Sequence, residues 1–306
     1  MSRKKKKEPL APPLKTFDFG TIRPQIEGLM FNLERDLKKR MNAVSSHDTA
    51  RGFLLMRVAA LMMKQLFDAI RFLCADEPSP GRRPEYVFAV PSITRTLLEI
   101  LLTVLYVGED FPARSEAFFR SGWREHHEER AKYRNEYAKS PEWSQFFRNF
   151  EKSLQMGIKE LGITPEEIKD PKQIKYSPIG QHLIGAMGSQ NRAYANWLEK
   201  WFYSECSAIA HFTPTARMKT SMYFMRDVMP KELITNSEAE SLMRFKALYY
   251  MMATIAVVAI ASELEHLFNL GNRNQIVKIW ESMRGTISDA QEVCHRRYDK
   301  LLHMTP

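Results

Sequence analysis

The sequence lacks most of the short motifs that mark enzyme classes and secreted proteins. Its three cysteines are odd in number, far apart and without the close spacing of a zinc or redox motif: Cys74, Cys206 and Cys294. It holds no phosphate-binding glycine loop, no nucleophile-elbow serine and no dinucleotide fingerprint. We therefore expect a protein of the reducing cytoplasm that needs no cofactor.

Long apolar runs are also scarce. The longest, residues 247–261, is short for a bilayer span and is soon followed by Glu263. No apolar stretch follows the basic N-terminus, because Glu8 and several prolines interrupt it, so a secretory signal is not expected. These patterns predict a cytoplasmic protein with no membrane insertion.

The net charge of +9 is concentrated at the N-terminus, because residues 1–15 hold six basic side chains and one acid, or +5 of the total. The basic side chains are Arg3, Lys4, Lys5, Lys6, Lys7 and Lys15. We expect residues 1–20 to form a basic, proline-rich, disordered arm. Such an arm either contacts the phosphates of nucleic acid or acidic lipid, or only aids solubility.

Apolar residues recur at helical spacing through the rest of the chain, and strand alternation is hard to find. This predicts an all-α fold, an irregular bundle of about 8–10 helices with no significant sheet. A hydrophobic content of 44% is enough for one helical domain over residues 21–306. The expected helices cover about 24–44, 48–74, 86–107, 113–139, 141–161, 191–214, 237–270, 275–283 and 286–302.

Two segments depart from this pattern. Residues 162–190 are rich in glycine and proline and predict a long loop or insertion that covers a site. After Pro214, four methionines recur at helical spacing: Met218, Met222, Met225 and Met229. Core packing is the first interpretation of this stripe, and an adaptable partner surface is the alternative.

Two motifs about a hundred residues apart place polar groups in apolar helices. Arg95 lies among leucines and isoleucines, where it is costly to bury unless Glu99, one turn on, pairs with it. In the second motif, Ser207 and His211 are four residues apart and share a helical face. We expect Arg95, Glu99, Ser207 and His211 to converge on one polar site.

These motifs, with Pro91 before the first and Tyr203 and Ser204 in the second, resemble the bacterial proteins of domain of unknown function 5677. The resemblance covers about residues 50–265 and implies a helical bundle in which the polar residues meet. Such bundles are in turn similar to the HEPN superfamily, which includes metal-independent ribonucleases of toxin and phage-defence systems. This implies an RNA-directed effector, in which Tyr203 and Ser204 are further site candidates.

The HEPN catalytic signature is an arginine followed after four to six residues by a histidine, and no arginine stands at that distance before His211. The spacing occurs instead at Arg120 with His126 or His127, where a solvated charged face is the alternative. In an RNA-cleaving site, His211 would act as base or acid and Arg95 would hold the phosphate. Glu99 would orient the arginine and Ser207 would hydrogen-bond His211. The competing interpretation is a satisfied buried network that fixes helix register.

Two further interpretations stay open. Two acid–histidine pairs have di-iron-like spacing: Glu263 with His266, and Glu292 with His295. Such a centre also requires a lone glutamate from each of two further helices, and Glu99 is the only obvious candidate. The other is a non-catalytic sensor or assembly module. It would bind a protein partner or a second copy through the methionine stripe and through Trp197 and Trp201.

Overall fold

The computed structural model describes residues 19–75, 84–137, 140–211 and 237–304, and every regular element within these ranges is helical. The all-α prediction is therefore confirmed for the described part of the chain, which contains no strand. The predicted basic arm, with Arg3 and Lys4 to Lys7, lies outside the described residues up to residue 18, as does the methionine stripe. Residues 19 and 20, at the end of the predicted arm, already belong to the first helix.

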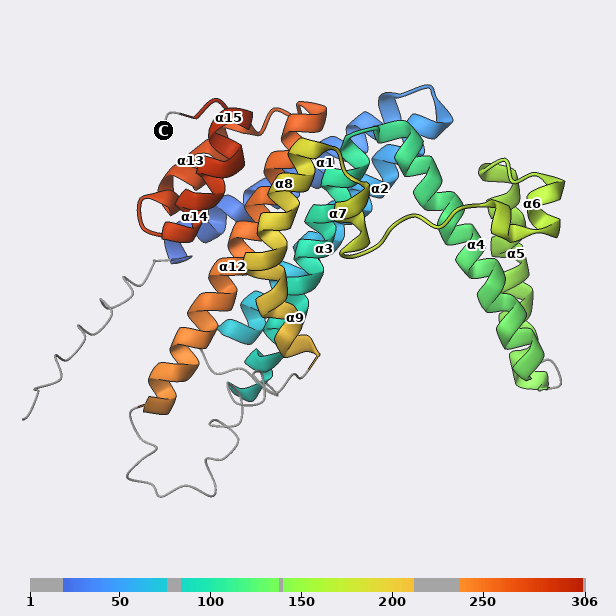
Figure 1. Cartoon of the computed structure of the whole chain (residues 1–306), viewed down its shortest axis with the longest axis horizontal. Helices are drawn as coiled ribbons and strands as arrows, with labels where there is room; N and C mark the ends of the chain where they lie inside the picture. The colour runs from blue at the N-terminus through green and yellow to red at the C-terminus, as the bar shows by residue number, and fades with distance from the viewer. Residues whose placement is uncertain (1–18, 76–83, 138–139, 212–236, 305–306) are drawn as a thin grey trace, which may run out of the picture.

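Long helices lying roughly side by side form the main bundle (Figure 1). They are α1 (Phe19–Ala43), α2 (His47–Cys74), α3 (Val90–Gly108), α8 (Ser189–Leu198), α9 (Ser204–Ala210) and α12 (Ser237–Phe268). The short η1 (Pro84–Ala89) precedes α3, and the π-helical η4 (Glu199–Tyr203) joins α8 to α9. Helix α3 packs against α2, α9 and α12, so the helix that carries the first motif lies in the middle of the bundle.

The C-terminal elements pack at one end of the bundle, near α1 and α12 (Figure 1). They are α13 (Arg273–Arg284), α14 (Ser288–Val293), the π-helical η6 (Cys294–Tyr298) and α15 (Asp299–Leu301). The chain turns into them after α12 through Asn269 and Gly271, which have positive φ angles of 48° and 87°. Glycine adopts that conformation without a steric penalty, so Gly271 suits the turn that follows this helix.

Helix α12 is apolar nearly all round because it forms the centre of the core. Its residues from Met252 to Glu265 are all buried, including Ser262, whose hydroxyl accepts a 2.9 Å hydrogen bond from Trp280 Nε1. Each fully buried valine or isoleucine contributes about 1.5–3 kcal/mol to stability. The core is thus built around this helix.

In the part of the chain that the structure describes, two helical stretches are long and apolar enough to cross a membrane by length and composition alone, Tyr86–Gly108 and Met243–Phe268. Their most apolar windows are 56% and 78% buried within the bundle. Packing inside the protein therefore explains their composition, and the absence of membrane insertion stays a prediction.

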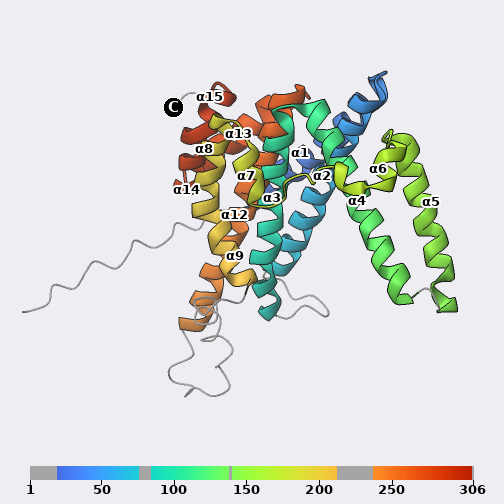
Figure 2. The same cartoon turned by 45° about the vertical axis from the view of Figure 1, so that its right-hand side comes forward.

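A second group of helices projects from the bundle (Figures 1 and 2). From here on, 'the arm' means this helical projection and not the predicted basic arm of residues 1–20. It consists of α4 (Phe111–Tyr137), η2 (Pro141–Trp143), α5 (Ser144–Glu160), α6 (Pro165–Lys169) and η3 (Pro171–Gln173). The arm has a small core of its own: Trp123, Phe150, Leu154, Ile163 and Ile174. Trp123 Nε1 donates to the Leu154 carbonyl at 3.1 Å, and α5 approaches closely because a Cβ at Gly157 would lie 2.5 Å from the Trp123 ring.

The base of the arm is fixed by aromatic packing. Phe111, the first residue of α4, lies against Phe53 and Phe268, with ring centroids 5.2 and 4.8 Å away. Gly52 makes room for this ring, since a Cβ there would come within 2.7 Å of it. A salt bridge of 2.7 Å from Arg51 to Glu116 adds a polar tie between α2 and α4.

Candidate functional site

The candidate site lies where α3 packs against α9 (Figure 1). The inward face of α3 is apolar and buried at Leu97, Leu98 and Leu101. Arg95 and Glu99 lie at the edge of that face, with side chains 24% and 35% exposed. Solvent therefore reaches both groups, and the pair is not sealed inside the core.

Four side chains meet at this edge. Arg95 Nε donates to Glu99 Oε1 at 3.2 Å and to the Tyr203 hydroxyl at 3.1 Å, and its Nη1 lies 2.9 Å from His211 Nε2. The Tyr203 hydroxyl in turn donates to Glu99 Oε1 at 2.9 Å. The structure thus brings three of the four expected residues together and adds Tyr203, which was only a secondary candidate. We call these four residues the Arg95 cluster.

The contact between Arg95 and His211 joins a donor to a ring nitrogen. An arginine side chain only donates hydrogen bonds, so Nε2 of His211 is the acceptor in this contact. Among the described residues, Nη2 of Arg95 has no hydrogen-bond partner. The cluster therefore offers an incoming anion a free guanidinium edge next to an imidazole.

Tyr203 is the most enclosed member of the cluster. Burial raises the pKa of its phenol, and hydrogen bonding to Glu99 raises it further, while Arg95 opposes the shift. The phenol therefore stays protonated at neutral pH. The Arg95 guanidinium also lies over the Tyr203 ring, 5.1 Å from its centroid, a cation–π contact that helps to fix the arginine.

A π-helical turn places Tyr203. The turn η4 holds one residue more than an α-helical turn, so two neighbouring side chains, Phe202 and Tyr203, both point inward. Phe202 is fully buried in the core, and Tyr203 reaches Arg95. The sequence predicted one continuous helix over 191–214, and nothing in its hydrophobic spacing indicated this wider turn.

The connection from the arm back to the bundle ends against the site. A Cβ built at Gly180 would lie 3.8 Å from the Tyr203 hydroxyl, and the φ angle there is +52°, which favours glycine. Gln181 Nε2 donates to Glu199 Oε1 at 2.9 Å and ties the same segment to η4. The structure thus places Gly180 and Gln181, within the predicted loop of residues 162–190, beside the site. That segment is not one long loop, because it contains α6, η3, α7 (His182–Ala186) and the start of α8.

The serines of the second motif are not part of the cluster. The backbone N–H of His211 donates to the Ser207 carbonyl at 2.9 Å, and the expected hydrogen bond between the Ser207 side chain and His211 is not formed. The exposed Ser204 hydroxyl donates to the Lys200 carbonyl at 2.8 Å. Cys206 is buried, and burial raises the pKa of its thiol to about 12, so it is not a nucleophile at neutral pH.

The arginine–histidine spacing on α4 serves the packing of the arm. Arg120 donates to the Leu161 carbonyl at 2.8 Å and pairs with Glu167. The His126 ring lies 4.4 Å from Phe150, and the His127 ring 5.4 Å from Trp123. These residues lie on the arm, away from the Arg95 cluster (Figure 1).

The two acid–histidine pairs have other partners. Arg297 binds both carboxylate oxygens of Glu263, and Arg296 pairs with Glu292 at 2.6 Å. Within the described ranges, no group of three or more histidine, cysteine or acidic side chains could hold a metal ion. His266 and His295 are both exposed.

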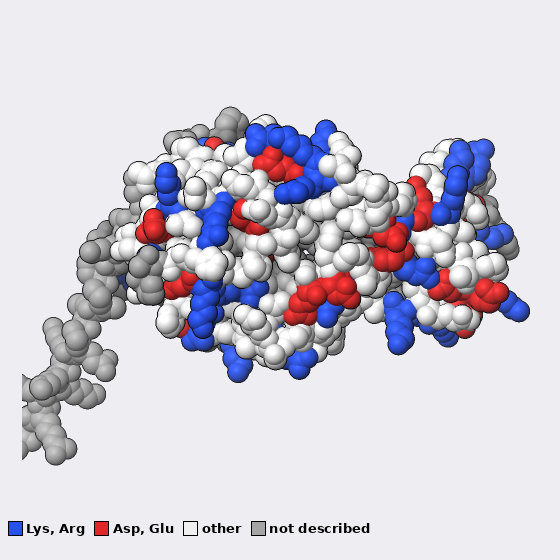
Figure 3. Space-filling view, turned by 90° about the horizontal axis from the view of Figure 1, so that it is seen from above, with Lys and Arg blue, Asp and Glu red and all other residues white. Residues whose placement is uncertain are grey.

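Charges of both signs are interspersed over the face seen in Figure 3 rather than gathered by sign. Comparison of the chain with family models, with curated proteins and with solved structures finds no match. The resemblance to domain of unknown function 5677, and through it to HEPN proteins, therefore stays a prediction. Function must be argued from the cluster itself.

Proposed function

We propose that the protein acts on RNA, cleaving it without a metal ion at the Arg95 cluster, as an effector of the toxin or phage-defence kind. One observation carries the proposal: a solvent-reachable guanidinium is held by a carboxylate and a phenol, and one of its nitrogens contacts a histidine imidazole. This combination provides a phosphate-binding cation and a base within one hydrogen bond of each other.

The proposed reaction uses the 2′-hydroxyl of RNA as the nucleophile. When Arg95 turns its Nη groups to a phosphate, Nε2 of His211 is released and takes the 2′-hydroxyl proton. The 2′-oxygen forms a bond to phosphorus, Arg95 stabilises the charge of the phosphorane, and the bond to the 5′-oxygen breaks. The leaving oxygen takes a proton from the solvent that reaches the cluster, giving a 2′,3′-cyclic phosphate and a 5′-hydroxyl end.

Glu99 has a positioning role in this proposal. It binds Nε of Arg95 and the Tyr203 hydroxyl, and so leaves the Nη side of the guanidinium directed at His211. The alternative is that the four residues only fix the register of α3 and α9. A network of that kind is normally closed to solvent, whereas the Arg95 and Glu99 side chains are 24% and 35% exposed.

A second candidate function is a non-catalytic assembly module, and one surface favours it. Leu54, Val58 and Met62 follow each other at four-residue intervals on α2, with exposed fractions of 39%, 42% and 43%. An apolar stripe of this kind is suited to a protein partner or a second copy. Trp197 and Trp201, which were also predicted to bind a partner, are partly buried and pack against the core.

The test is incubation of the purified full-length protein with mixed tRNA and rRNA in excess chelator. We expect the wild type to cleave and His211→Ala and Arg95→Ala to be slower by about 100-fold or more, the usual effect of losing an acid–base or charge-stabilising group. His295→Ala and Arg148→Ala, at exposed positions, are the matched controls and should cleave normally.

The ends of the products complete this test. Cyclic-phosphate ends, lost in both site variants while their helical circular dichroism is retained, would support the proposal. Intact RNA with every protein, or equal cleavage by His211→Ala and His295→Ala, would refute it. A concentration-dependent dimer with no cleavage would favour the assembly module.

A further inference from the structure

The arm returns to the bundle through a short segment, residues 174–181, which we call the strap (Figure 1). At the arm end of the strap, Arg124 Nη1 donates to the Ile174 carbonyl at 2.8 Å, and Ser121 Oγ accepts the Ser177 N–H at 3.0 Å. Ser121 and Ile174 are both buried in the arm. The first residues of the strap are therefore fixed to α4.

Tyr176 adds a side-chain contact between the strap and the surface of α4. Its hydroxyl donates to Glu128, and the Arg124 guanidinium lies over its ring, 3.7 Å from the centroid. Arg124 Nε also donates to Glu128 Oε1 at 2.8 Å, so the three side chains hold one another. The hydrogen bond to Glu128 raises the pKa of the Tyr176 phenol, which therefore stays protonated and keeps donating at neutral pH.

The other end of the strap reaches the Arg95 cluster. Gly180 lies so close to Tyr203 that an added Cβ would be 3.8 Å from the phenol oxygen. The backbone of Gly180 thus covers this hydroxyl and contributes to the burial that raises its pKa. The cover keeps water from the atom that accepts from Arg95 and donates to Glu99.

The strap is too short for its two ends to move independently. Only Pro178 and Ile179 separate Ser177 from Gly180. Three residue steps span at most about 11 Å, and the proline ring fixes one φ angle near about −65°. The attachment of Ser177 to the arm therefore restricts where Gly180 can lie.

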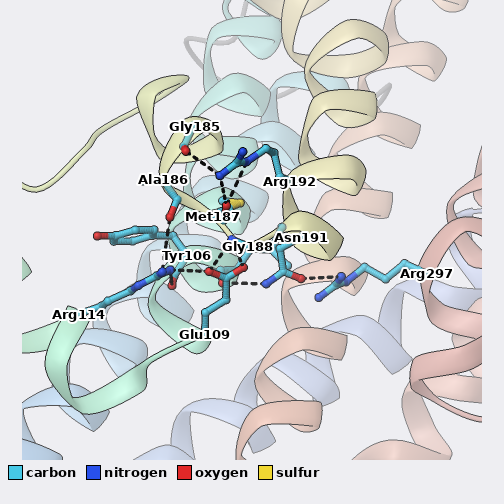
Figure 4. Close-up of polar contacts among 11 residues, drawn as sticks. Tyr106, Glu109, Arg114, Gly185, Ala186, Met187, Gly188, Asn191, Arg192 and Arg297 are labelled. Atoms are coloured by element: carbon cyan, nitrogen blue, oxygen red, sulfur yellow. Dashed lines mark hydrogen bonds and ion pairs between the residues drawn. The ribbon is translucent and has the colours of Figure 1, made fainter.

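The far end of α7, which follows the strap, is tied to the start of the arm (Figure 4). The Glu109 carboxylate accepts the Gly188 N–H at 2.9 Å. Arg114, on α4, donates to Glu109 Oε2 at 2.7 Å and to the Ala186 carbonyl at 3.4 Å. The strap and α7 are thus held between the two points at which the arm joins the bundle.

A buried polar cluster at the opposite end of α3 from Arg95 fixes the start of α8 behind this tie (Figure 4). Arg297, on η6, donates Nη1 to Asn191 Oδ1 at 2.9 Å and its other nitrogens to Glu263. Asn191 Nδ2 donates to the Leu105 carbonyl at 3.3 Å, near the end of α3. The start of α8 therefore belongs to the frame of the bundle, whereas the strap depends on the arm.

We propose that the arm is a positioning element of the Arg95 cluster: Tyr176 holds the strap on α4, and the strap holds Gly180 over the Tyr203 hydroxyl. Tyr176 is a positioning residue, because it acts on Tyr203 only through the strap. The alternative is that the 2.9 Å contact of Gln181 with Glu199 alone keeps Gly180 in place. The effect on Tyr203 is independent of RNA, and only its effect on cleavage rests on the proposed function.

The test is fluorine NMR of the full-length protein labelled with fluorotyrosine. The Tyr203 resonance is the one missing from Tyr203→Phe, and its pH titration reports how well the phenol is covered. In the wild type we expect its midpoint to lie above those of exposed tyrosines, because burial raises the pKa of Tyr203. Tyr176→Ala should lower this midpoint, and Tyr176→Phe, which keeps a ring under Arg124, should lower it less.

The matched control is Tyr137→Ala. Tyr137 is the last residue of α4, its ring stacks on Trp143 at 4.4 Å, and its exposed fraction of 36% is close to the 45% of Tyr176. This variant should leave the Tyr203 midpoint where it is in the wild type. An unchanged midpoint in Tyr176→Ala, or equal changes in Tyr176→Ala and Tyr137→Ala, would overturn the proposal.

RNA cleavage by the same proteins separates this proposal from the proposed function. Tyr176→Ala should cleave about tenfold or more slowly than the wild type, because a displaced Tyr203 no longer holds Arg95 in its reacting geometry. Tyr137→Ala should cleave normally. A lowered Tyr203 midpoint in Tyr176→Ala with no cleavage by any protein would support the positioning and refute the ribonuclease. Cleavage by the wild type with an unchanged midpoint in Tyr176→Ala would refute the positioning alone.

Discussion

The two ends of α3 carry polar clusters of different construction. At the first, the Arg95 and Glu99 side chains are 24% and 35% exposed, and Arg95 contacts a histidine. At the second, the Arg297 and Glu263 side chains are 9% and 2% exposed and form a two-point ion pair. The first cluster can exchange one partner for a ligand, whereas the second cannot lose a partner without leaving a buried charge.

Both clusters depend on a π-helical turn. The turn η4 presents Tyr203 to Arg95, and the turn η6 presents Arg297 to Glu263. Such turns interrupt regular helical hydrogen bonding and are often found at functional sites. Their presence at both clusters shows that helix geometry is altered where polar residues must enter the bundle.

The largest expected effect is on the buried pair. Arg297→Ala should destabilise the protein by about 3–5 kcal/mol, because it leaves the Glu263 carboxylate buried and unpaired. Urea unfolding followed by circular dichroism measures this loss. The double variant Arg297→Met with Glu263→Leu should recover much of it, and a double variant as unstable as the single one would show that the pair itself stabilises the fold.

Replacing a glycine by alanine near each of the two clusters should lower the stability of the protein by different amounts. A Cβ at Gly108 would come within 2.7 Å of the Leu267 side chain, so Gly108→Ala should cost about 1–3 kcal/mol through overpacking. At Gly180 an added Cβ would meet no close neighbour, and only the φ angle of +52° disfavours alanine. Gly180→Ala should therefore destabilise the protein by about 1 kcal/mol. Thermal unfolding of the two variants should rank them in this order, and the reverse order would contradict the packing described here.

The Arg95 cluster should contribute little to stability. Arg95→Ala should cost at most about 1 kcal/mol, because its pair with Glu99 is partly exposed and screened by water. The same urea measurement tests this value. A loss comparable to that of Arg297→Ala would mean that the first cluster is also a structural ion pair.

The smallest effect at neutral pH involves the buried thiols. Burial raises the pKa of Cys206 and of Cys294 from 9.0 to about 12. Because the folded value is the higher one, their contribution to stability is complete below pH 9 and is lost as the pH rises toward 12. Cys206→Ala should flatten the fall in unfolding free energy over that range, whereas Cys74→Ala, at a half-buried position, is the control. Equal slopes for the two variants would contradict the burial of Cys206.

The all-α fold was predictable because hydrophobic spacing records which face of each helix is buried. The helix expected over 48–74, for example, is observed as His47–Cys74. Arg95 and Glu99 were found for a related reason, since a charge on an apolar helix requires a partner one turn away. His211 joins them as expected, although its role remains a prediction.

The unpredicted features depend on tertiary structure. Hydrophobic spacing does not encode a π-helical turn, so Tyr203 could not be preferred to Ser207 as a member of the site. The pairing of Glu263 with Arg297 joins residues 34 positions apart, and the spacing of Glu263 and His266 instead indicated a metal site. The turn from Glu109 to Arg114 was also missed, although opposite charges five residues apart at a helix junction were a usable signal.

Chemical rescue tests the central claim most directly, namely that His211 transfers a proton beside Arg95. Single-turnover cleavage of an RNA oligonucleotide in chelator would be measured for His211→Ala and Arg95→Ala, each with and without added imidazole. The account predicts that imidazole restores cleavage to His211→Ala and leaves Arg95→Ala inactive. Active wild type with no rescue of a folded His211→Ala, or equal rescue of both variants, would contradict it.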